Sequence, residues 1–198
     1  MKTYNIAIIG AGPAGYFSAQ ALQNYANTET NFKIDLIERL STPWGLVRNG
    51  VAPDHEKIKA VSEIFENISS NTSFRFFGNV QVGKDINLKS LVENYDVVIL
   101  AVGSSQSKKL NIPGENLKNY FTAEQFVSWY NSHPDFKNLE INTNVEHAVI
   151  IGAGNVALDI TRILLKDIDE LKSTDISLDY VEKFDLRQLK AVMIKASF

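Results

Sequence analysis

The sequence predicts an α/β fold in which one strand–turn–helix plan occurs twice, and three observations support this prediction. Apolar runs of strand length lead into the motifs GAGPAG at 10–15 and GAGNVA at 152–157. Amphipathic stretches of helix length follow the motifs, at 16–25 and at 156–166. A further apolar run of strand length comes after each helix. Since these are the parts of a dinucleotide-binding unit, we expect two Rossmann-like domains.

The first motif has the G-x-G-x-x-G spacing, with Gly10, Gly12 and Gly15 between the first strand and its helix. The run at 33–38 is the next predicted strand, and it ends in Glu38, which lies 23 residues beyond Gly15. At that distance a carboxylate accepts hydrogen bonds from the adenosine ribose, so the pattern predicts a dinucleotide site. The alternative is that the glycines only shape a tight turn and that Glu38 is a solvated strand end.

The second motif has Gly152 and Gly154 in the first two glycine positions and Ala157 in the third. Alanine there is compatible with a nicotinamide dinucleotide, and the next strand is expected at 189–194. No acidic residue follows that strand, so nothing favours a free ribose 2′-hydroxyl. Lys195 is available for a 2′-phosphate, but a lysine lacks the forked geometry of arginine.

Two segments lie between the motifs and need separate interpretation. The stretch 41–55 is too rich in glycine and proline for regular structure and too apolar for a solvated loop, so we expect an ordered loop that packs on a ligand or on a core. The run 95–103 is predicted to be a buried parallel strand of the first sheet.

Composition excludes several classes of protein. The 198 residues contain no cysteine, which excludes disulfides, thiolate metal sites and a redox-active dithiol. The three histidines of the chain, His55, His133 and His147, lie far apart in the sequence without the H-x-x-H or H-E-x-x-H spacing of metal ligands, so no metal site is expected. A net charge of −3 without a basic stripe argues against nucleic acid. No apolar run approaches membrane-spanning length, and we expect a cytoplasmic protein, or a mitochondrial matrix protein if a presequence is removed.

Longer motifs occur in an order and spacing typical of one family. They are GAGPAG, TPWGLVRNGVAPDH, FRFFGNVQVG, YDVVILAVGS, NIPGE, FVSWYNSHPDF and IGAGNVALDITRILL. With these motifs the chain closely resembles the N-terminal part of the adrenodoxin reductase-like ferredoxin–NADP+ reductases, particularly the bacterial members. GLVRNGVAPDH is far more specific than either glycine motif.

The resemblance implies FAD in the first site and NADP(H) in the second. The family positions that contact FAD correspond to Ala14, Glu38, Leu46 and Val82. The positions that contact the NADP pyrophosphate correspond to Ala153, Gly154, Asn155 and Val156.

The resemblance also suggests a catalytic residue. His55, in the APDH motif, corresponds to a histidine near the nicotinamide–flavin junction, where it would assist transfer. The alternative is that His55 holds the shape of its loop by hydrogen bonding. Arg48 meets a phosphate or fixes the loop to a carboxylate, and Asp159 is interpreted as a helix residue with a structural partner.

The resemblance implies that residues 1–104 form the N-terminal part of an FAD domain and that residues 105–198 form the first part of an NADP domain. The implied function is a flavoprotein oxidoreductase that passes electrons from NADPH through FAD to a ferredoxin-type iron–sulfur protein. The family's arginine pair for the 2′-phosphate and its C-terminal FAD segment have no counterpart in this sequence, so we expect impaired activity. Three alternatives stay open: an inactive FAD- or nucleotide-binding fragment, a fragment that fails to fold, and a transhydrogenating module of the glutamate synthase small-subunit type.

Overall fold

The computed structural model describes residues 1–104, 107–185 and 188–195, and within them the two glycine motifs fall into separate units. The first unit comprises Met1–Arg48 and Lys57–Ser104. The second comprises Asn49–Glu56 and Ser105–Phe198. The chain therefore passes between the units three times.

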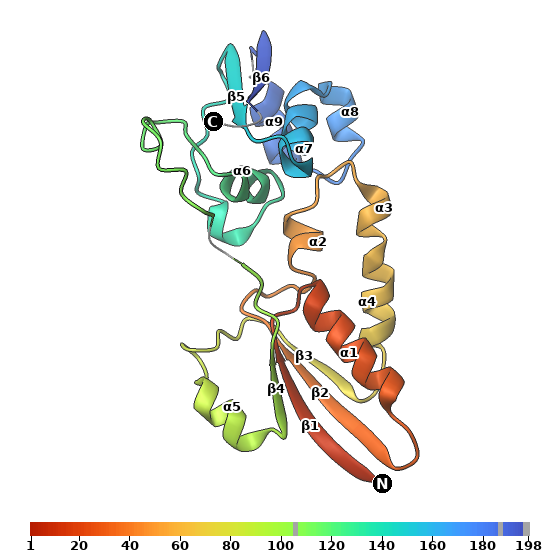
Figure 1. Cartoon of the computed structure of the whole chain (residues 1–198). Coiled ribbons are helices and arrows are strands. Elements are labelled where there is room, and N and C mark those ends of the chain that lie inside the picture. Colours follow the sequence, from red (N-terminus) through yellow and green to blue (C-terminus); the bar gives the residue numbers. More distant parts are fainter. Residues whose placement is uncertain (105–106, 186–187, 196–198) are drawn as a thin grey trace. The chain divides into compact units, whose positions relative to one another are not determined.

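The first unit is a four-stranded parallel sheet with the strand order β3-β2-β1-β4. Its elements are β1 (Lys2–Ile9), α1 (Pro13–Tyr25), β2 (Thr30–Ile37), α4 (Val61–Ser69), β3 (Phe74–Phe77), α5 (Leu88–Asn94) and β4 (Val97–Leu100). Helices α1 and α4 cover one face of the sheet, and α5 lies on the other face (Figure 1). The predicted α/β class is confirmed, since all the strands are parallel and helices cover both faces.

Successive side chains along β1 point to opposite faces of the sheet and belong to two separate hydrophobic clusters. Ile6 and Ile8 of β1 pack with α1 and α4, in a core that includes Tyr16 and Phe65. The intervening residues of β1 face the other way and pack in a smaller cluster with Leu91 of α5. Strands buried on both faces read as continuous apolar runs, which is why β1 and β2 were recognisable in the sequence. The expected burial of the strand within 95–103 is not found, since Val97 of β4 is 46% exposed and Leu100 is 62% exposed.

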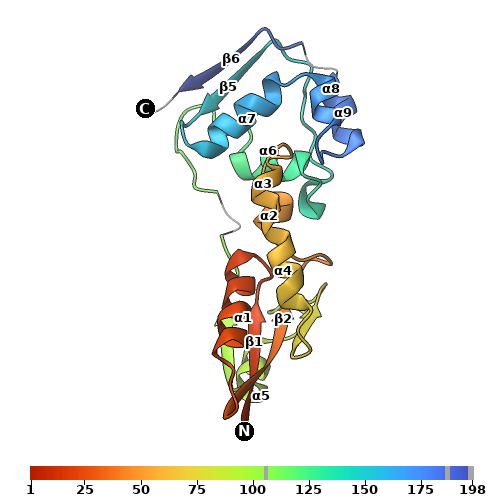
Figure 2. The ribbon, with the colours of Figure 1, turned by 90° about the vertical axis from the view of Figure 1, so that its right-hand side faces the viewer.

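The second unit holds the shorter, two-stranded parallel sheet β5-β6. Its elements are α6 (Ala123–Tyr130), the 3-10 helix η1 (Pro134–Phe136), β5 (His147–Ile151), α7 (Asn155–Leu165), α8 (Ile168–Lys172), α9 (Leu178–Asp185) and β6 (Ala191–Lys195). Helix α7 lies along one face of the sheet (Figure 2). Its buried residues join an aromatic cluster formed by Trp129, Tyr130 and Phe184.

The segment 49–56 differs from the sequence-based assignment, which placed it in the first domain. It connects the short helices α2 (Leu46–Asn49) and α3 (Glu56–Lys59), but it packs in the second unit. Ala52 is 1% exposed within the core of that unit, and polar contacts from Asp54 and His55 to α7 hold the rest of the segment. Residues 46–49 are helical, where the sequence predicted an irregular loop.

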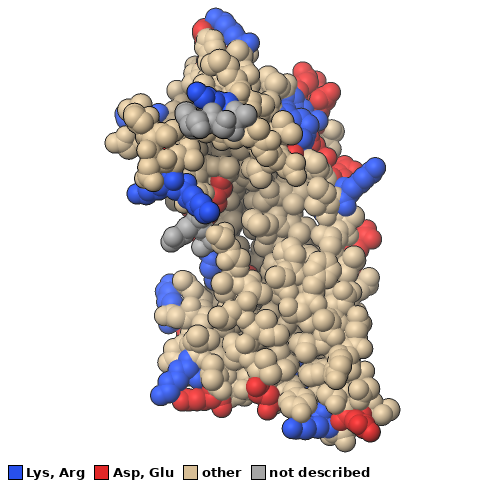
Figure 3. Space-filling model, in the orientation of Figure 1, with Lys and Arg blue, Asp and Glu red and all other residues tan. Residues whose placement is uncertain are grey.

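Charge is dispersed on the one face of the protein that Figure 3 shows. On the face shown in Figure 3, basic and acidic side chains are interspersed and most of the surface carries neither. In the described part of the chain, no helix combines the length and apolar character that crossing a membrane requires. The same residues contain no group of three or more His, Asp or Glu side chains that could hold a metal ion.

Candidate dinucleotide sites

The first glycine motif forms the turn between β1 and α1, and two of its glycines are required by packing. Gly10 has a φ of +106°, and a Cβ there would overlap the carbonyl group of Ala101. A Cβ on Gly15 would overlap the carbonyl oxygen of Gly10 and lie 3.2 Å from Leu36 Cδ1. Gly10 therefore permits the tight turn, and Gly15 permits close contact between helix and strand.

Gly12 has a different role, because nothing lies within 4 Å of the position that its Cβ would take. Its φ of −83° and ψ of −176° are open to any residue, so neither backbone strain nor packing explains a glycine here. A glycine facing open space at the start of a helix lets a ligand approach the backbone closely, which is what a pyrophosphate requires.

Glu38, the acid predicted from spacing, lies beside this turn. Its carboxylate accepts hydrogen bonds from the backbone N–H of Ala11 (2.9 Å) and of Leu40 (3.0 Å). Each carboxylate oxygen has a second lone pair, so these bonds orient the group and leave acceptor capacity for a hydroxyl. The structure thus joins Glu38 to the glycine turn, whereas the alternative of a solvated strand end leaves these bonds unexplained.

The segments that contain Leu46 and Val82 reach the same end of the sheet. Trp44 donates its backbone N–H to the Ala11 carbonyl (2.7 Å), which brings the following residues, including the 69% exposed Leu46, next to the turn. Val80 donates to the carbonyl of Glu38 (2.9 Å), and Val82 is partly buried two residues later. All these groups gather at the carboxyl ends of parallel strands, where ligands bind in open α/β sheets.

Arg48 makes no ion pair with a carboxylate among the described residues, so the expected fixing of its loop to a carboxylate is not found. Its Nε donates to the carbonyl of Pro43 (3.1 Å), and its guanidinium lies 4.3 Å from the ring centroid of Trp44. The arginine therefore folds back on its own loop.

The second glycine motif forms the turn between β5 and α7 in the second unit. Gly152 has a φ of +129° and donates its N–H to the Lys195 carbonyl at the end of β6 (2.8 Å). Gly154, like Gly12, has nothing within 4 Å of a Cβ position. Ala153, Asn155 and Val156 are all exposed. The four predicted contact residues therefore form one accessible turn at the start of α7.

Helices α1 and α7 begin with glycine at the N-cap and have no side-chain cap. By contrast, the side chains of Asn87, Thr122 and Asp167 cap helices α5, α6 and α8. The first N–H groups of α1 and α7 therefore lack the side-chain acceptor that these other helices have. Such donors, together with the helix dipole, favour a pyrophosphate, so the residues present in both turns fit a dinucleotide.

A polar network in the second unit surrounds His55. The His55 Nε2 atom lies 3.0 Å from Asp159 Oδ1, and Asp159 also accepts a hydrogen bond from Arg162 NH1 (2.8 Å). Arg162 donates two further bonds, from Nε and NH2, to the two oxygens of Asp54 (2.7 and 2.8 Å). Lys166 Nζ is 3.4 Å from the same carboxylate. The interpretation of Asp159 as a helix residue with a structural partner is confirmed, and that partner set includes His55.

The electrostatics of this network are dominated by the Asp54–Arg162 pair. Hydrogen bonds from Arg162 lower the pKa of Asp54 to about 2, even though burial acts in the opposite direction. The same pair raises the pKa of Arg162. Because these hydrogen bonds keep the pKa of Asp54 far below neutral pH, the pair is charged at ordinary pH values and holds segment 49–56 on α7.

Comparison with known proteins places the chain in a family. The family model described as "Pyridine nucleotide-disulphide oxidoreductase" matches residues 4–182. The chain belongs to this family. The 198 residues contain no cysteine.

Individual members of the family are much more similar than the fold alone requires. NADPH-ferredoxin reductase FprA of Mycobacterium leprae is 49% identical over 193 residues, covering 96% of this chain and 42% of that protein. The probable mitochondrial NADPH:adrenodoxin oxidoreductase of Schizosaccharomyces pombe is 45% identical over 190 residues, covering 96% and 40%. The structure titled "Mycobacterium tuberculosis FprA in complex with NADPH" matches with a TM-score of 0.95 at 47% identity, over 98% of this chain and 43% of that chain. The chain thus spans less than half the length of these relatives.

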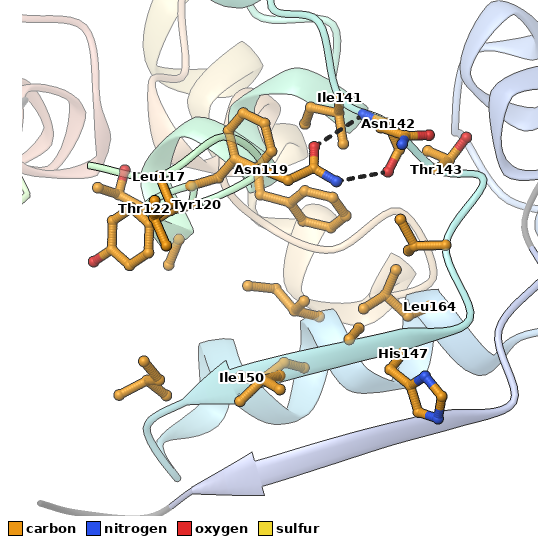
Figure 4. Close-up of a pocket in the computed structure, with 18 of the residues that line it drawn as sticks. Leu117, Asn119, Tyr120, Thr122, Ile141, Asn142, Thr143, His147, Ile150 and Leu164 are labelled. Carbon is orange, nitrogen blue, oxygen red and sulfur yellow. Dashed lines mark hydrogen bonds between the residues drawn. The ribbon is translucent and has the colours of Figure 1, made fainter. Parts of the chain in front are cut away.

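Two features of this family member were missed by the sequence analysis. One is the Asp54–Arg162 pair, whose residues are separated by 108 positions and carry no local signal of contact. The other is a pocket of about 650 Å³ in the second unit, lined by apolar residues such as Ile150 and Leu164 with Asn119 and Asn142 at its rim (Figure 4). The residues of the second glycine turn, 152–156, do not line this pocket.

Proposed function

We propose that this chain is the dinucleotide-binding portion of a flavoprotein oxidoreductase that passes electrons from NADPH through FAD to a ferredoxin-type iron–sulfur protein. The observation that carries the proposal is the presence of two separate glycine turns, each open at Gly12 or Gly154 and each at the start of a helix without a side-chain cap. A single turn would indicate only one nucleotide.

FAD is assigned to the first unit, at 1–48 and 57–104. The turn at 10–15 provides N–H groups for the pyrophosphate, and Glu38 provides an oriented acceptor for the ribose. Leu46 is a large apolar side chain exposed next to this turn, as expected for a residue that contacts a bound ring system. Val82 would contact the same ligand from the segment that follows β3.

NADP(H) is assigned to the second unit, in the turn formed by Gly152–Val156. The exposed N–H groups at the start of α7 would bind the pyrophosphate. This assignment also rests on the relative whose structure is titled as a complex with NADPH and matches this chain with a TM-score of 0.95.

The protein contributes positioning rather than a nucleophile. When bound, the two cofactors supply hydride transfer between rings and the release of single electrons. The glycine turns orient the pyrophosphates, and the hydrogen bond to Asp159 orients His55. Because Nε2 of His55 lies 3.0 Å from Asp159, the ring nitrogen proposed to assist transfer is Nδ1.

The electron acceptor is proposed from the relatives, which are described as ferredoxin and adrenodoxin reductases. The 198 residues contain no cysteine and therefore no thiolate ligands for an iron–sulfur cluster. We also propose a cytoplasmic or mitochondrial matrix location, since the Schizosaccharomyces pombe relative is described as mitochondrial.

The experiment that tests this function is an anaerobic titration of the purified chain, supplied with FAD, with NADPH. We expect FAD to bind in stoichiometric amount, its visible absorption band to bleach on addition of NADPH, and a ferredoxin then to be reduced slowly or not at all, in keeping with the expected impairment. A folded chain that binds no FAD would refute the assignment of the first turn. A bound flavin that dithionite reduces but NADPH does not would instead indicate a nucleotide-binding protein without turnover.

A further inference from the structure

The network around His55 contains an arginine, Arg162, that lies within the motif IGAGNVALDITRILL but was given no role from the sequence. Arg162 lies on α7, the helix whose N-terminus carries the second glycine turn. Its guanidinium donates through Nε and NH2 to Asp54 and through NH1 to Asp159. Asp54 precedes His55 in the chain, and Asp159 contacts the His55 ring. One planar group therefore holds both the backbone neighbour and the hydrogen-bond partner of this histidine.

We propose that Arg162 is a positioning residue that fixes the imidazole of His55 against helix α7. The inference rests on the proposed function for its catalytic consequence, but the positioning itself concerns only described contacts within the second unit. Removing Arg162 would leave Asp54 largely buried with only the more distant Lys166 ammonium at 3.4 Å. It would also free the Asp159 carboxylate to turn away from His55.

The positioning of His55 depends on the planar, forked guanidinium of Arg162 and not merely on its positive charge. Arg162 makes a bidentate pair with Asp54 and a third bond to Asp159, which requires three N–H donors in one plane. A lysine at the same position has a single ammonium on a flexible stem and cannot match that geometry. Lys166, the C-cap residue of α7, places an ammonium 3.4 Å from the same Asp54 carboxylate but lacks the forked geometry of arginine, so it is the matched control for charge alone.

The test reads the His55 ring directly by ¹H–¹⁵N spectroscopy of imidazole protons in the full chain. Only three histidines are present, so the variants His133→Gln and His147→Gln assign the remaining signal to His55. In the wild-type chain we expect a protected Nε2 proton, because Nε2 faces Asp159 at 3.0 Å. In Arg162→Met that proton should exchange with water roughly tenfold faster or more, since the local opening that exposes it becomes easier. Arg162→Lys should resemble Arg162→Met, and Lys166→Met should resemble the wild type.

A second variant keeps the inference testable if Arg162→Met does not fold. Asp54→Asn preserves side-chain size and leaves Arg162 in place, and it should increase exchange of the same proton. If Asp54 acts through Arg162, the double variant should be no worse than Arg162→Met alone, because the two changes break one unit. Unchanged exchange in Asp54→Asn and in every Arg162 variant that folds, or wild-type behaviour of Arg162→Lys, would overturn the inference.

A kinetic measurement separates this inference from the proposed function. In the FAD-loaded chain, Arg162→Met should slow flavin reduction by NADPH by about tenfold to a hundredfold while the dissociation constant of NADP+ changes little. Faster exchange at His55 with an unchanged reduction rate would support the positioning and refute a role for His55 in transfer. Slower reduction with an unchanged His55 signal would contradict the positioning role of Arg162.

Discussion

The substitutions Gly12→Ala and Gly15→Ala add the same methyl group three residues apart, but we expect opposite consequences. At Gly15 the new carbon would overlap the carbonyl oxygen of Gly10 and press on Leu36. At Gly12 it would meet nothing within 4 Å. The first change should therefore damage the fold, and the second should damage only the binding of a ligand.

The magnitudes for Gly15→Ala can be compared directly. Replacing a helical glycine with alanine gains about 1 kcal/mol in helix propensity. Overpacking costs about 1–3 kcal/mol, and the upper end applies here because the Gly10 carbonyl is backbone that cannot rotate away. We expect a net loss of about 2 kcal/mol in the free energy of unfolding, with weaker FAD binding as a consequence.

For Gly12→Ala the backbone angles are ordinary, so the free energy of unfolding should change by about 1 kcal/mol or less. The methyl would occupy the space through which a pyrophosphate approaches the N–H groups of α1. We expect FAD affinity to fall at least tenfold, which corresponds to about 1.4 kcal/mol.

Urea unfolding followed by circular dichroism measures the first quantity, and quenching of flavin fluorescence measures the second. Gly154→Ala is the matched control, because it places the same methyl in the equivalent turn of the second unit and should leave FAD affinity unchanged. Unaltered FAD affinity in Gly12→Ala would refute the assignment of this turn. A Gly15→Ala chain as stable as the wild type would refute the packing argument.

Three further predictions follow from the structure. Gly154→Ala should suppress flavin reduction by NADPH but not by dithionite, and loss of both in the same anaerobic titration would mean that the turns do not serve separate cofactors. The pKa of Asp54 is lowered from 3.8 to about 2 in the folded state, so its charge contributes at most about 2 kcal/mol to the free energy of unfolding. This contribution is present above pH 4 and is lost as pH falls towards 2. Asp54→Asn should remove this pH dependence of the free energy of unfolding measured in urea, and an unchanged pH dependence would contradict the prediction. Arg75→Ala leaves the 2% exposed Asp35 with the Tyr95 hydroxyl but without its bidentate partner, so it should lower the free energy of unfolding more than Lys89→Ala, which breaks a pair of exposed side chains; equal losses in urea unfolding would refute the contrast.

Several element boundaries differ from the sequence-based prediction for local reasons. Helix α1 begins at Pro13 rather than near Tyr16, since proline is favourable at the first helical position, directly after the Gly12 N-cap. Strand β4 covers only Val97–Leu100 of the predicted run 95–103. Tyr95 instead ends helix α5 and donates its hydroxyl to Asp35. Whether Tyr95 extends the strand or caps the helix and bonds to Asp35 depends on tertiary contacts that the local sequence does not specify.

The sequence by itself determined the parallel α/β class, the two glycine turns and the placement of Glu38. These depend on short-range signals: apolar runs, glycines at fixed spacing and an acid at the end of the next strand. The same signals predicted that 41–55 would be ordered, because its apolar residues must be buried somewhere.

Only the tertiary structure decided where that segment is buried and what holds it. Segment 49–56 joins the second unit because Ala52 enters its core and Asp54 pairs with Arg162, 108 residues away in the chain. Neither residue's type nor its neighbours specify that partner, since an aspartate and an arginine on separate elements could equally be solvated. The pairing is fixed by the folding of α7 against segment 49–56, which brings the Arg162 guanidinium within hydrogen-bond distance of Asp54. The same packing excludes water from the ion pair and so strengthens it.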